Sequence, residues 1–173
     1  MELLAPAGSR QALTAAVQSG ADAVYLGGPQ FGARYSAENF TIEEMKTWVD
    51  YCHLYGVDVH VTVNTLVKEK EIESLKEYLK QLNEIGVDAL IVQDMGAAEI
   101  IKKTVPDMTL HASTQMTVTS LEGVKYLEDM GFSRVVLARE LSEKEIEHIC
   151  KNAKAEIEVF VHGAICMCYS GQC

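Results

Sequence analysis

The sequence lacks several features that would assign it to a familiar class of protein. It has no apolar run long enough to span a membrane. It also has no basic region followed by a cleavage site at its N-terminus, so no signal peptide is expected. Its five cysteines are odd in number and gathered towards one end, which does not suit a disulfide framework. These absences predict a cytoplasmic protein with no membrane partner.

A surplus of basic residues is missing as well. The chain has 15 lysines and arginines against 25 acidic residues, for a formal net charge of −10. Proteins that bind nucleic acid electrostatically neutralise phosphates with Lys and Arg. This stretch alone is therefore not expected to bind RNA or DNA through its charge.

The common catalytic and metal-binding motifs are absent too. There is no G-x-S-x-G nucleophile elbow, no H-E-x-x-H zinc motif and no glycine fingerprint of a nucleotide-binding fold. Three cysteines near the C-terminus, Cys166, Cys168 and Cys173, have C-x-C and C-x6-C spacing, whereas zinc sites usually have C-x2-C pairs. From spacing alone, these residues are either ligands of a thiol-binding centre or ordinary thiols in a buried loop.

A repeated pattern is present instead. Gly20-Ala21-Asp22, Gly56-Val57-Asp58 and Gly86-Val87-Asp88 each separate a helical segment from an apolar strand, and Gly131-Phe132-Ser133 is a weaker copy. Regular alternation of strands and helices predicts a parallel sheet. We predict an α/β fold, a TIM-like (β/α) barrel that is incomplete, with about seven parallel strands and intervening helices. The expected strands cover residues 2–5, 23–26, 57–63, 89–93, 108–112, 134–138 and 156–162, within a single catalytic domain over residues 1–173 that is truncated at its C-terminal end.

Barrel enzymes carry their active sites at the C-terminal ends of the strands. In the third strand, valines alternate with Asp58, His60, Thr62 and Asn64, which would face the barrel interior. Such polar interiors suggest ligand chemistry, although a satisfied hydrogen-bond network would look the same. We predict catalytic roles for Asn64, His111, Glu158 and His162. We predict substrate binding by Arg34, Gln93, Asp94, Ser113, Gln115, Arg139 and Glu140.

The C-terminal stretch from Glu158 to Cys173 reads E-V-F-V-H-G-A-I-C-M-C-Y-S-G-Q-C. It resembles the signature of peptidase family U32, the collagenase-like proteases. Further matching segments are E-L-L-A-P-A-G at residues 2–8, G-A-D-A-V-Y-L-G-G at 20–28, F-G-A-R at 31–34, D-A-L-I-V-Q-D at 88–94, L-H-A-S-T-Q at 110–115 and V-L-A-R-E-L at 136–141. Within the family, the chain is most similar to the branch of ribosomal-RNA cytidine hydroxylases.

The resemblance implies a barrel-like catalytic domain and four cysteines that hold a [4Fe–4S] cluster. Cys166 and Cys173 stand where the first two metal ligands would be, while Cys168 falls where relatives carry a small residue. The other two ligands would lie in a longer protein, so this chain alone is expected to hold no intact cluster. We expect Cys166 and Cys173 to lie close together, with their thiols facing the same space as His162.

Three functions compete at this point. The first is an iron–sulfur enzyme that hydroxylates RNA bases, with RNA bound largely beyond this chain and a small carboxylated co-substrate held by Arg34 and Arg139. The second is a peptidase, for which a Cys166–His162 dyad is conceivable and Ser170 has no evident base. The third is a hydrolase with one metal ion held by His60, His111 and His162.

An incomplete barrel leaves two sheet edges open. Exposed strand edges and apolar flanks invite pairing with another chain. The 173-residue chain by itself is therefore expected to self-associate.

Overall fold

The computed structural model describes residues 1–33, 40–163 and 167–172. The chain divides into two compact units, Met1–Met108 and Thr109–Cys173. Each unit is a run of strands and helices in alternation, and each is described by itself.

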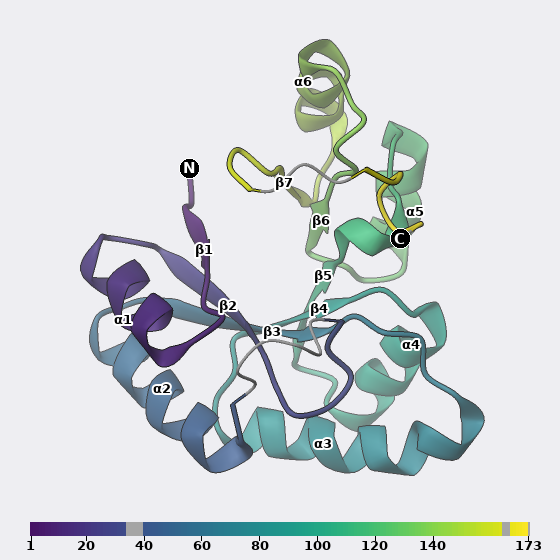
Figure 1. Ribbon diagram of the computed structural model, residues 1–173. Helices are drawn as coiled ribbons and strands as arrows, with labels where there is room; N and C mark the ends of the chain where they lie inside the picture. The colour runs from purple at the N-terminus through teal and green to yellow at the C-terminus, as the bar shows by residue number, and fades with distance from the viewer. Residues whose placement is uncertain (34–39, 164–166, 173) are drawn as a thin grey trace. The chain divides into compact units, whose positions relative to one another are not determined.

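The described residues of the first unit form four strands and four α-helices. In chain order the elements are β1 (Leu4–Pro6), α1 (Arg10–Gln18), β2 (Ala23–Gly27), α2 (Ile42–Leu54), β3 (Asp58–Val63), the 3-10 turn η1 (Glu69–Glu71), α3 (Ile72–Glu84), β4 (Ala89–Val92) and α4 (Met95–Thr104). The strands pair in parallel with their sequence neighbours, with Val24 opposite Val59 and Val61 opposite Leu90. Helices α2, α3 and α4 all lie on one side of strands β2 to β4 (Figure 1).

Local signals fix the ends of these helices. Ser9 caps α1 by accepting a hydrogen bond from the backbone N–H of Ala12. Thr41 and Glu44 form a reciprocal capping box at the start of α2, which satisfies two backbone donors that a helix would otherwise leave unpaired. Gly56 has a positive φ of 70° directly after α2, a conformation that glycine adopts without steric cost.

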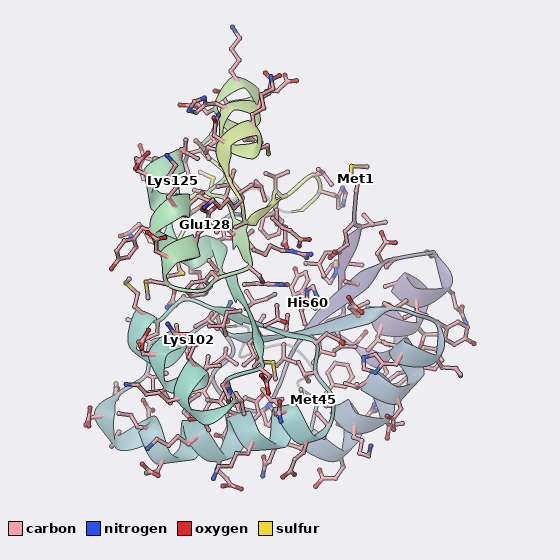
Figure 2. The ribbon with its side chains drawn as sticks, turned by 180° about the vertical axis from the view of Figure 1, so that it is seen from behind. Met1, Met45, His60, Lys102, Lys125 and Glu128 are labelled. Carbon is pink, nitrogen blue, oxygen red and sulfur yellow. The ribbon has the colours of Figure 1, made fainter. Side chains whose placement is uncertain are left out.

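Alternation along β3 separates the two faces of the sheet in the first unit. Val59, Val61 and Val63 are fully buried, as expected for side chains packed under the helices. His60 is also buried, but it lies on the other face of the strand from Met45 of α2 (Figure 2). The three valines thus share one buried face, whereas of the four polar residues predicted to face the interior His60 is buried, Thr62 and Asn64 are half-buried and Asp58 is exposed.

The second unit holds three strands and two α-helices in its described part. The elements are β5 (Thr109–Ala112), the 3-10 turn η2 (Thr114–Met116), α5 (Leu121–Asp129), β6 (Arg134–Val136), α6 (Glu143–Asn152) and β7 (Glu156–Glu158). Strand β6 pairs in parallel with both β5 and β7. Ser142 and Glu145 form a capping box at the start of α6, and Ser120 caps α5 by accepting a hydrogen bond from the backbone N–H of Gly123.

The last strand is shorter than predicted. It ends at Glu158, so the expectation of a strand over residues 156–162 is wrong for its second half. The alternation of residue types continues to His162, but the side chains of Val159, Phe160, Val161 and His162 are all exposed. Alternation alone therefore did not locate the end of the strand, because a strand also needs a paired neighbour and a buried face.

The fold class is nevertheless the predicted one. Seven strands alternate with helices, and every strand pair described within the two units is parallel, as in an incomplete (β/α) barrel. Within the part of the chain that the structure describes, no helix is both long and apolar enough to cross a bilayer.

Candidate active site

In the first unit, the loop after β2 is held by side chains that follow β3. The side-chain oxygen of Asn64 accepts a hydrogen bond from the backbone N–H of Ala33 at 3.0 Å. The hydroxyl of Thr65 donates to the carbonyl of Phe31 at 3.2 Å. Asn64, predicted to be catalytic, therefore supports the loop that leads to Arg34. Arg34 itself lies outside the described residues.

The same loop packs closely against a buried tyrosine. A Cβ atom placed on Gly28 would lie 1.8 Å from the hydroxyl oxygen of Tyr78 and 3.0 Å from the ring carbon that bears it. The phenol is buried, and its hydroxyl has no hydrogen-bond partner among the described residues. Burial raises the pKa of Tyr78 far above its ordinary value, so this residue stays neutral. Gly28 is required here because no side chain fits beside the phenol.

Asp94, directly after β4, also holds neighbouring backbone segments in place. One carboxylate oxygen of Asp94 accepts from the backbone N–H of Ala97 at 2.9 Å and thereby caps α4. The other oxygen accepts from the N–H of Val67 at 3.0 Å. Both oxygens of this predicted substrate-binding residue are thus engaged with backbone donors. The neighbouring Gln93 is half-buried.

In the second unit, the end of β5 carries a group of buried polar residues. His111 and Ser113 are both buried, at 4% exposure each. The hydroxyl of Ser113 accepts a hydrogen bond from the backbone N–H of Gln115 and caps the 3-10 turn. The side-chain carbonyl oxygen of Gln115 is buried and has no hydrogen-bond partner among the described residues. Of the predicted binding residues, Gln115 therefore has the clearest unused hydrogen-bonding capacity.

A tight turn precedes the final cysteine of the chain. The backbone N–H of Gln172 donates to the carbonyl of Tyr169 at 3.0 Å, and Gly171 has a φ of +78°. A positive φ at the third residue is typical of a type II turn and favours glycine. Ser170, the second residue of this turn, is completely buried although the residues on either side of it are exposed.

All three polar atoms of Ser170 have partners within the second unit. Its N–H donates to a carboxylate oxygen of Glu140 at 2.8 Å. Its hydroxyl oxygen accepts from the N–H of Arg139 at 3.2 Å. Its carbonyl accepts from the hydroxyl of Thr117 at 2.6 Å. Ser170 is therefore a fully bonded buried residue, and its hydroxyl is not disposed as an exposed nucleophile.

Two further features fix this turn to the segment after β5. A Cβ atom on Gly171 would lie 2.4 Å from the carbonyl oxygen of Gln115 and 2.5 Å from the hydroxyl oxygen of Thr117. Thr117 itself has a left-handed conformation, with a φ of 56°, which is uncommon for a β-branched residue. The turn and the segment that it touches are thus built around each other.

Glu140 and Arg139, which follow β6, differ in how far their side chains are already engaged within the protein. The carboxylate of Glu140 binds the N–H of Ser170, and this hydrogen bond holds the pKa of Glu140 below its usual value. The backbone of Arg139 serves the same turn, while its guanidinium lies 5.7 Å from the centre of the exposed Phe160 ring. The side chain of Arg139 is exposed, so it can still reach an anionic ligand.

Glu158, predicted to be catalytic, belongs to an ion-pair group between β6 and β7. Arg134 is 92% buried and donates two hydrogen bonds to Glu156, at 2.9 and 2.6 Å. The guanidinium also lies 3.6 Å from Glu158. His162, expected to lie on the same strand as Glu158, is exposed beyond the end of β7. The structure therefore does not place these two side chains on one strand.

The described cysteines differ in their exposure to solvent. Cys52 is buried in α2, and burial raises the pKa of its thiol to about 11, so it is unreactive. Cys168 is exposed on the segment that carries the turn. The predicted ligands Cys166 and Cys173 lie outside the described residues. Within residues 1–33, 40–163 and 167–172, no group of three or more His, Cys, Asp and Glu side chains is placed to hold a metal ion.

Parallel strands that alternate with helices in both units define an α/β protein of the barrel type. The chain belongs to peptidase family U32, whose sequence model matches residues 8–173. The resemblance seen in the sequence motifs is therefore confirmed.

Two relatives show which members of the family are similar. The chain is 45% identical to the 23S rRNA 5-hydroxycytidine C2501 synthase of Escherichia coli (strain K12), over 100% of this chain and 26% of that protein. It is 41% identical to the tRNA hydroxylation protein P1 of Bacillus subtilis (strain 168), over 99% of this chain and 41% of that protein. The chain thus spans between about a quarter and two-fifths of the length of these relatives.

A solved structure supports the fold. The U32 peptidase Mk0906 superposes with a TM-score of 0.76 and 20% sequence identity, over 92% of this chain and 68% of that one. Identity at this level establishes the shared architecture and nothing about the reaction.

Sequence reasoning missed the supporting roles of Tyr78 in the first unit and of Thr117 and Ser170 in the second. Tyr78 and Thr117 lie outside the matched motifs, and Ser170 was considered only as a nucleophile. The Ser170-Gly171 dipeptide was the one available signal, because such pairs often mark turns. Nothing in the sequence revealed which backbone groups the buried serine would bind.

Proposed function

We propose that this chain is part of an iron–sulfur enzyme that hydroxylates bases of ribosomal or transfer RNA in the cytoplasm. The observation that carries the proposal is similarity over the whole chain to proteins named for rRNA and for tRNA hydroxylation, at 45% and 41% identity. The two names share one chemistry, the hydroxylation of RNA, and differ in the RNA that receives it.

RNA binding is proposed to rest largely on parts of the protein outside this chain. The chain carries a net charge of −10, and phosphate contacts require basic side chains. The relatives are also more than twice as long as the matched region. This chain would supply the site that receives the base, because a base that undergoes chemistry must leave its stack and enter a pocket.

The thiol chemistry fits half of a [4Fe–4S] site. Such clusters are held by about four cysteine thiolates, of which Cys166 and Cys173 would supply two. The described segment between them is held in place by the hydrogen bonds of Ser170. The remaining ligands would come from other parts of the protein. When bound, the cluster would supply the redox chemistry that oxidation of a base ring requires.

The chain's own residues suggest how substrates would be held. The guanidinium of Arg139 is exposed and next to Phe160, so it can bind the carboxylate of a small co-substrate. Arg34 is proposed from the sequence as a second candidate for this role. The unused carbonyl oxygen of Gln115 can accept a hydrogen bond from an exocyclic amino group of a base. His111 and Ser113 are buried beside this position in sequence and would keep it dry and polar.

The test uses the whole protein purified without oxygen. Bound iron and sulfide are measured, and RNA from cells with and without the gene is digested and compared by mass spectrometry. We expect iron and sulfide in the protein, and one nucleoside that loses a single oxygen atom when the gene is deleted.

Single substitutions then locate the chemistry. Cys166→Ala and Cys173→Ala should each lower bound iron and abolish hydroxylation while the barrel stays folded. Cys150→Ala is the matched control, because Cys150 is an exposed thiol on α6. Full iron content and activity in both Cys166→Ala and Cys173→Ala would show that the iron–sulfur assignment is wrong.

A peptidase remains the alternative, because it is the activity for which the family is named. The burial and full bonding of Ser170 argue against a serine nucleophile at this position. Cleavage of a collagen-like peptide by metal-free protein, lost in Cys166→Ala, would favour the peptidase instead.

A further inference from the structure

An exposed aromatic ring lies just beyond the end of the last strand. Phe160 follows β7 by two residues, and its side chain is 47% exposed. The guanidinium carbon of Arg139 lies 5.7 Å from the centre of this ring, within the range of a cation–π contact. Nearly half of the side chain stays open although a cation lies over the ring, so a second planar group can still stack on it.

The pairing of β6 with β7 brings these two side chains together. Val136 lies opposite Glu158, and the backbone N–H of Leu137 donates to the carbonyl of Glu158 at 2.9 Å. Arg139 follows Leu137 by two residues and Phe160 follows Glu158 by two residues. The contact between guanidinium and ring is therefore a consequence of the strand register.

Arg139 is held by its backbone rather than by its charge. Its N–H donates to the hydroxyl of the buried Ser170 at 3.2 Å, and the N–H of Ala138 donates to the carbonyl of Val118 at 3.0 Å. Among the described residues, no carboxylate forms an ion pair with the guanidinium. A planar guanidinium can cover a ring with its face while its N–H groups remain available for an anion.

An aromatic ring backed by a guanidinium is suited to receive a nucleobase. Unpaired bases stack on aromatic side chains and on the planes of Arg guanidinium groups. Such stacking accepts any base, because every base has a π-face. A base that undergoes chemistry must leave its own stack, and stacking on a protein side chain then replaces the contacts that it has lost.

We propose that Phe160, held against the guanidinium of Arg139, is the residue on which a base of the RNA substrate stacks. This inference rests on the proposed function, since the relatives are named for the hydroxylation of rRNA and of tRNA. The ring and the guanidinium lie beyond the C-terminal ends of β7 and β6, where barrel enzymes bind their substrates.

The competing occupant of the ring is a part of the protein outside this chain. A packed position accepts Leu, which has a similar apolar volume, whereas a stacking position needs a planar ring. Phe160→Leu and Phe160→Trp therefore distinguish packing from stacking. Tyr126→Ala is the matched control, because Tyr126 is an aromatic side chain at 58% exposure on α5 of the same unit.

The experiment uses the whole protein, purified without oxygen, with the melting temperature as the check of folding. Two fluorescent probes are titrated at one fixed salt concentration, and binding is followed by anisotropy. The first probe is single-stranded oligocytidylate of about ten nucleotides, chosen because one relative is named for 5-hydroxycytidine. The second probe has the same sugar–phosphate backbone without bases. The difference between the probes separates the contribution of the bases from that of the phosphates.

Loss of stacking should weaken the binding of oligocytidylate about tenfold in Phe160→Ala and in Phe160→Leu. Phe160→Trp keeps a planar ring and should stay within about threefold of the wild type. Tyr126→Ala should stay within about twofold of the wild type. All four variants should bind the probe without bases as the wild type does. If Phe160→Ala does not fold, Phe160→Leu supplies the comparison, because it keeps the apolar volume.

Wild-type binding of oligocytidylate in Phe160→Leu would overturn the proposal and would assign the ring to packing within the protein. Losses that are equal for the two probes would overturn it too. So would equal binding of both probes by the wild type, because no base would then be recognised. A wild-type protein that prefers the probe with bases but hydroxylates no RNA would overturn the proposed function. The variants would then still decide whether Phe160 stacks on a base.

Discussion

The contact between Gly28 and Tyr78 makes a quantitative prediction about stability. In Gly28→Ala, the added methyl group would lie 1.8 Å from the phenolic oxygen, against an ordinary carbon–oxygen contact of more than 3 Å. The phenol is buried at 3% exposure on α3 and cannot swing into solvent. Overpacking of this kind costs about 1–3 kcal/mol, and the severity of the clash puts the expected loss in the upper half of that range.

The hydroxyl of Tyr78 should contribute little by itself. It has no hydrogen-bond partner among the described residues, and an unpaired buried hydroxyl costs about 1–3 kcal/mol of desolvation. Tyr78→Phe removes this cost and leaves a small void. We therefore expect a change between zero and about 1 kcal/mol of added stability.

The double variant is the decisive measurement. In Gly28→Ala with Tyr78→Phe, the nearest atom to the new methyl group is the ring carbon at 3.0 Å, which is tight but can be relieved by a small shift. The double variant should be more stable than the sum of the two single effects predicts, by about 1–2 kcal/mol. Urea unfolding of the four proteins, followed by circular dichroism, gives the required free energies. Strictly additive effects would refute the argument from close contact.

Three further predictions concern pH, an ion pair and association. Backbone N–H groups hold the pKa values of Glu140 and Glu128 below the usual 4.5. Each carboxylate therefore stabilises the fold above pH 4.5 and loses this effect as the pH falls through the lowered pKa. The free energy of unfolding should then fall less steeply below pH 4.5 in Glu140→Gln and in Glu128→Gln than in the wild type. Arg134→Met should lower the free energy of unfolding by about 1–2 kcal/mol, and Glu156→Gln by less than about 1 kcal/mol, because the arginine is buried and Glu156 is mostly exposed. Equal losses for the two variants in urea unfolding would contradict this expectation. The 173-residue chain alone is expected to self-associate through strand edges, and a monodisperse monomer in light scattering at tens of micromolar would count against it.

The pattern of the fold could be read from the sequence because it depends on local signals. Gly56 and Gly86 end helices with a positive φ, and Thr41 with Glu44 begins one, so spacing alone locates these elements. Strand β7 was overestimated because Val159 and Val161 continue the alternation after pairing with β6 has stopped. Pairing depends on another part of the chain, which a local pattern cannot report.

The candidate site was predicted less completely, for a related reason. Polar residues lie at the end of β5 as the sequence pattern places them, and His111, Ser113 and Gln115 are buried or half-buried there. The sequence does not show which of these groups face ligand and which bind backbone. Asp94 has the same chemistry in either role, and only its hydrogen bonds to Ala97 and Val67 distinguish them.

The hydrogen bonds suggest a rule for dividing the polar strand ends between support and chemistry. In each unit, a loop at one strand end is held by polar groups that follow other strands: Asn64 holds the loop before Arg34, and Glu140 with Thr117 holds the turn before Cys173. A carboxylate or amide oxygen already bonded to a rigid backbone N–H gains less from a ligand, because binding would first break that hydrogen bond.

Fewer residues then remain as candidates for binding or converting a substrate. We propose that Asp94, Glu140 and Asn64 serve as supports, in place of the substrate-binding and catalytic roles predicted from the sequence. Gln115 and Arg139 keep a polar group with capacity for a ligand, the first through a buried carbonyl oxygen and the second through an exposed guanidinium. Substitutions in the first group should therefore act through stability or through the geometry of the loops, whereas substitutions in the second should change substrate binding in a protein that remains equally stable.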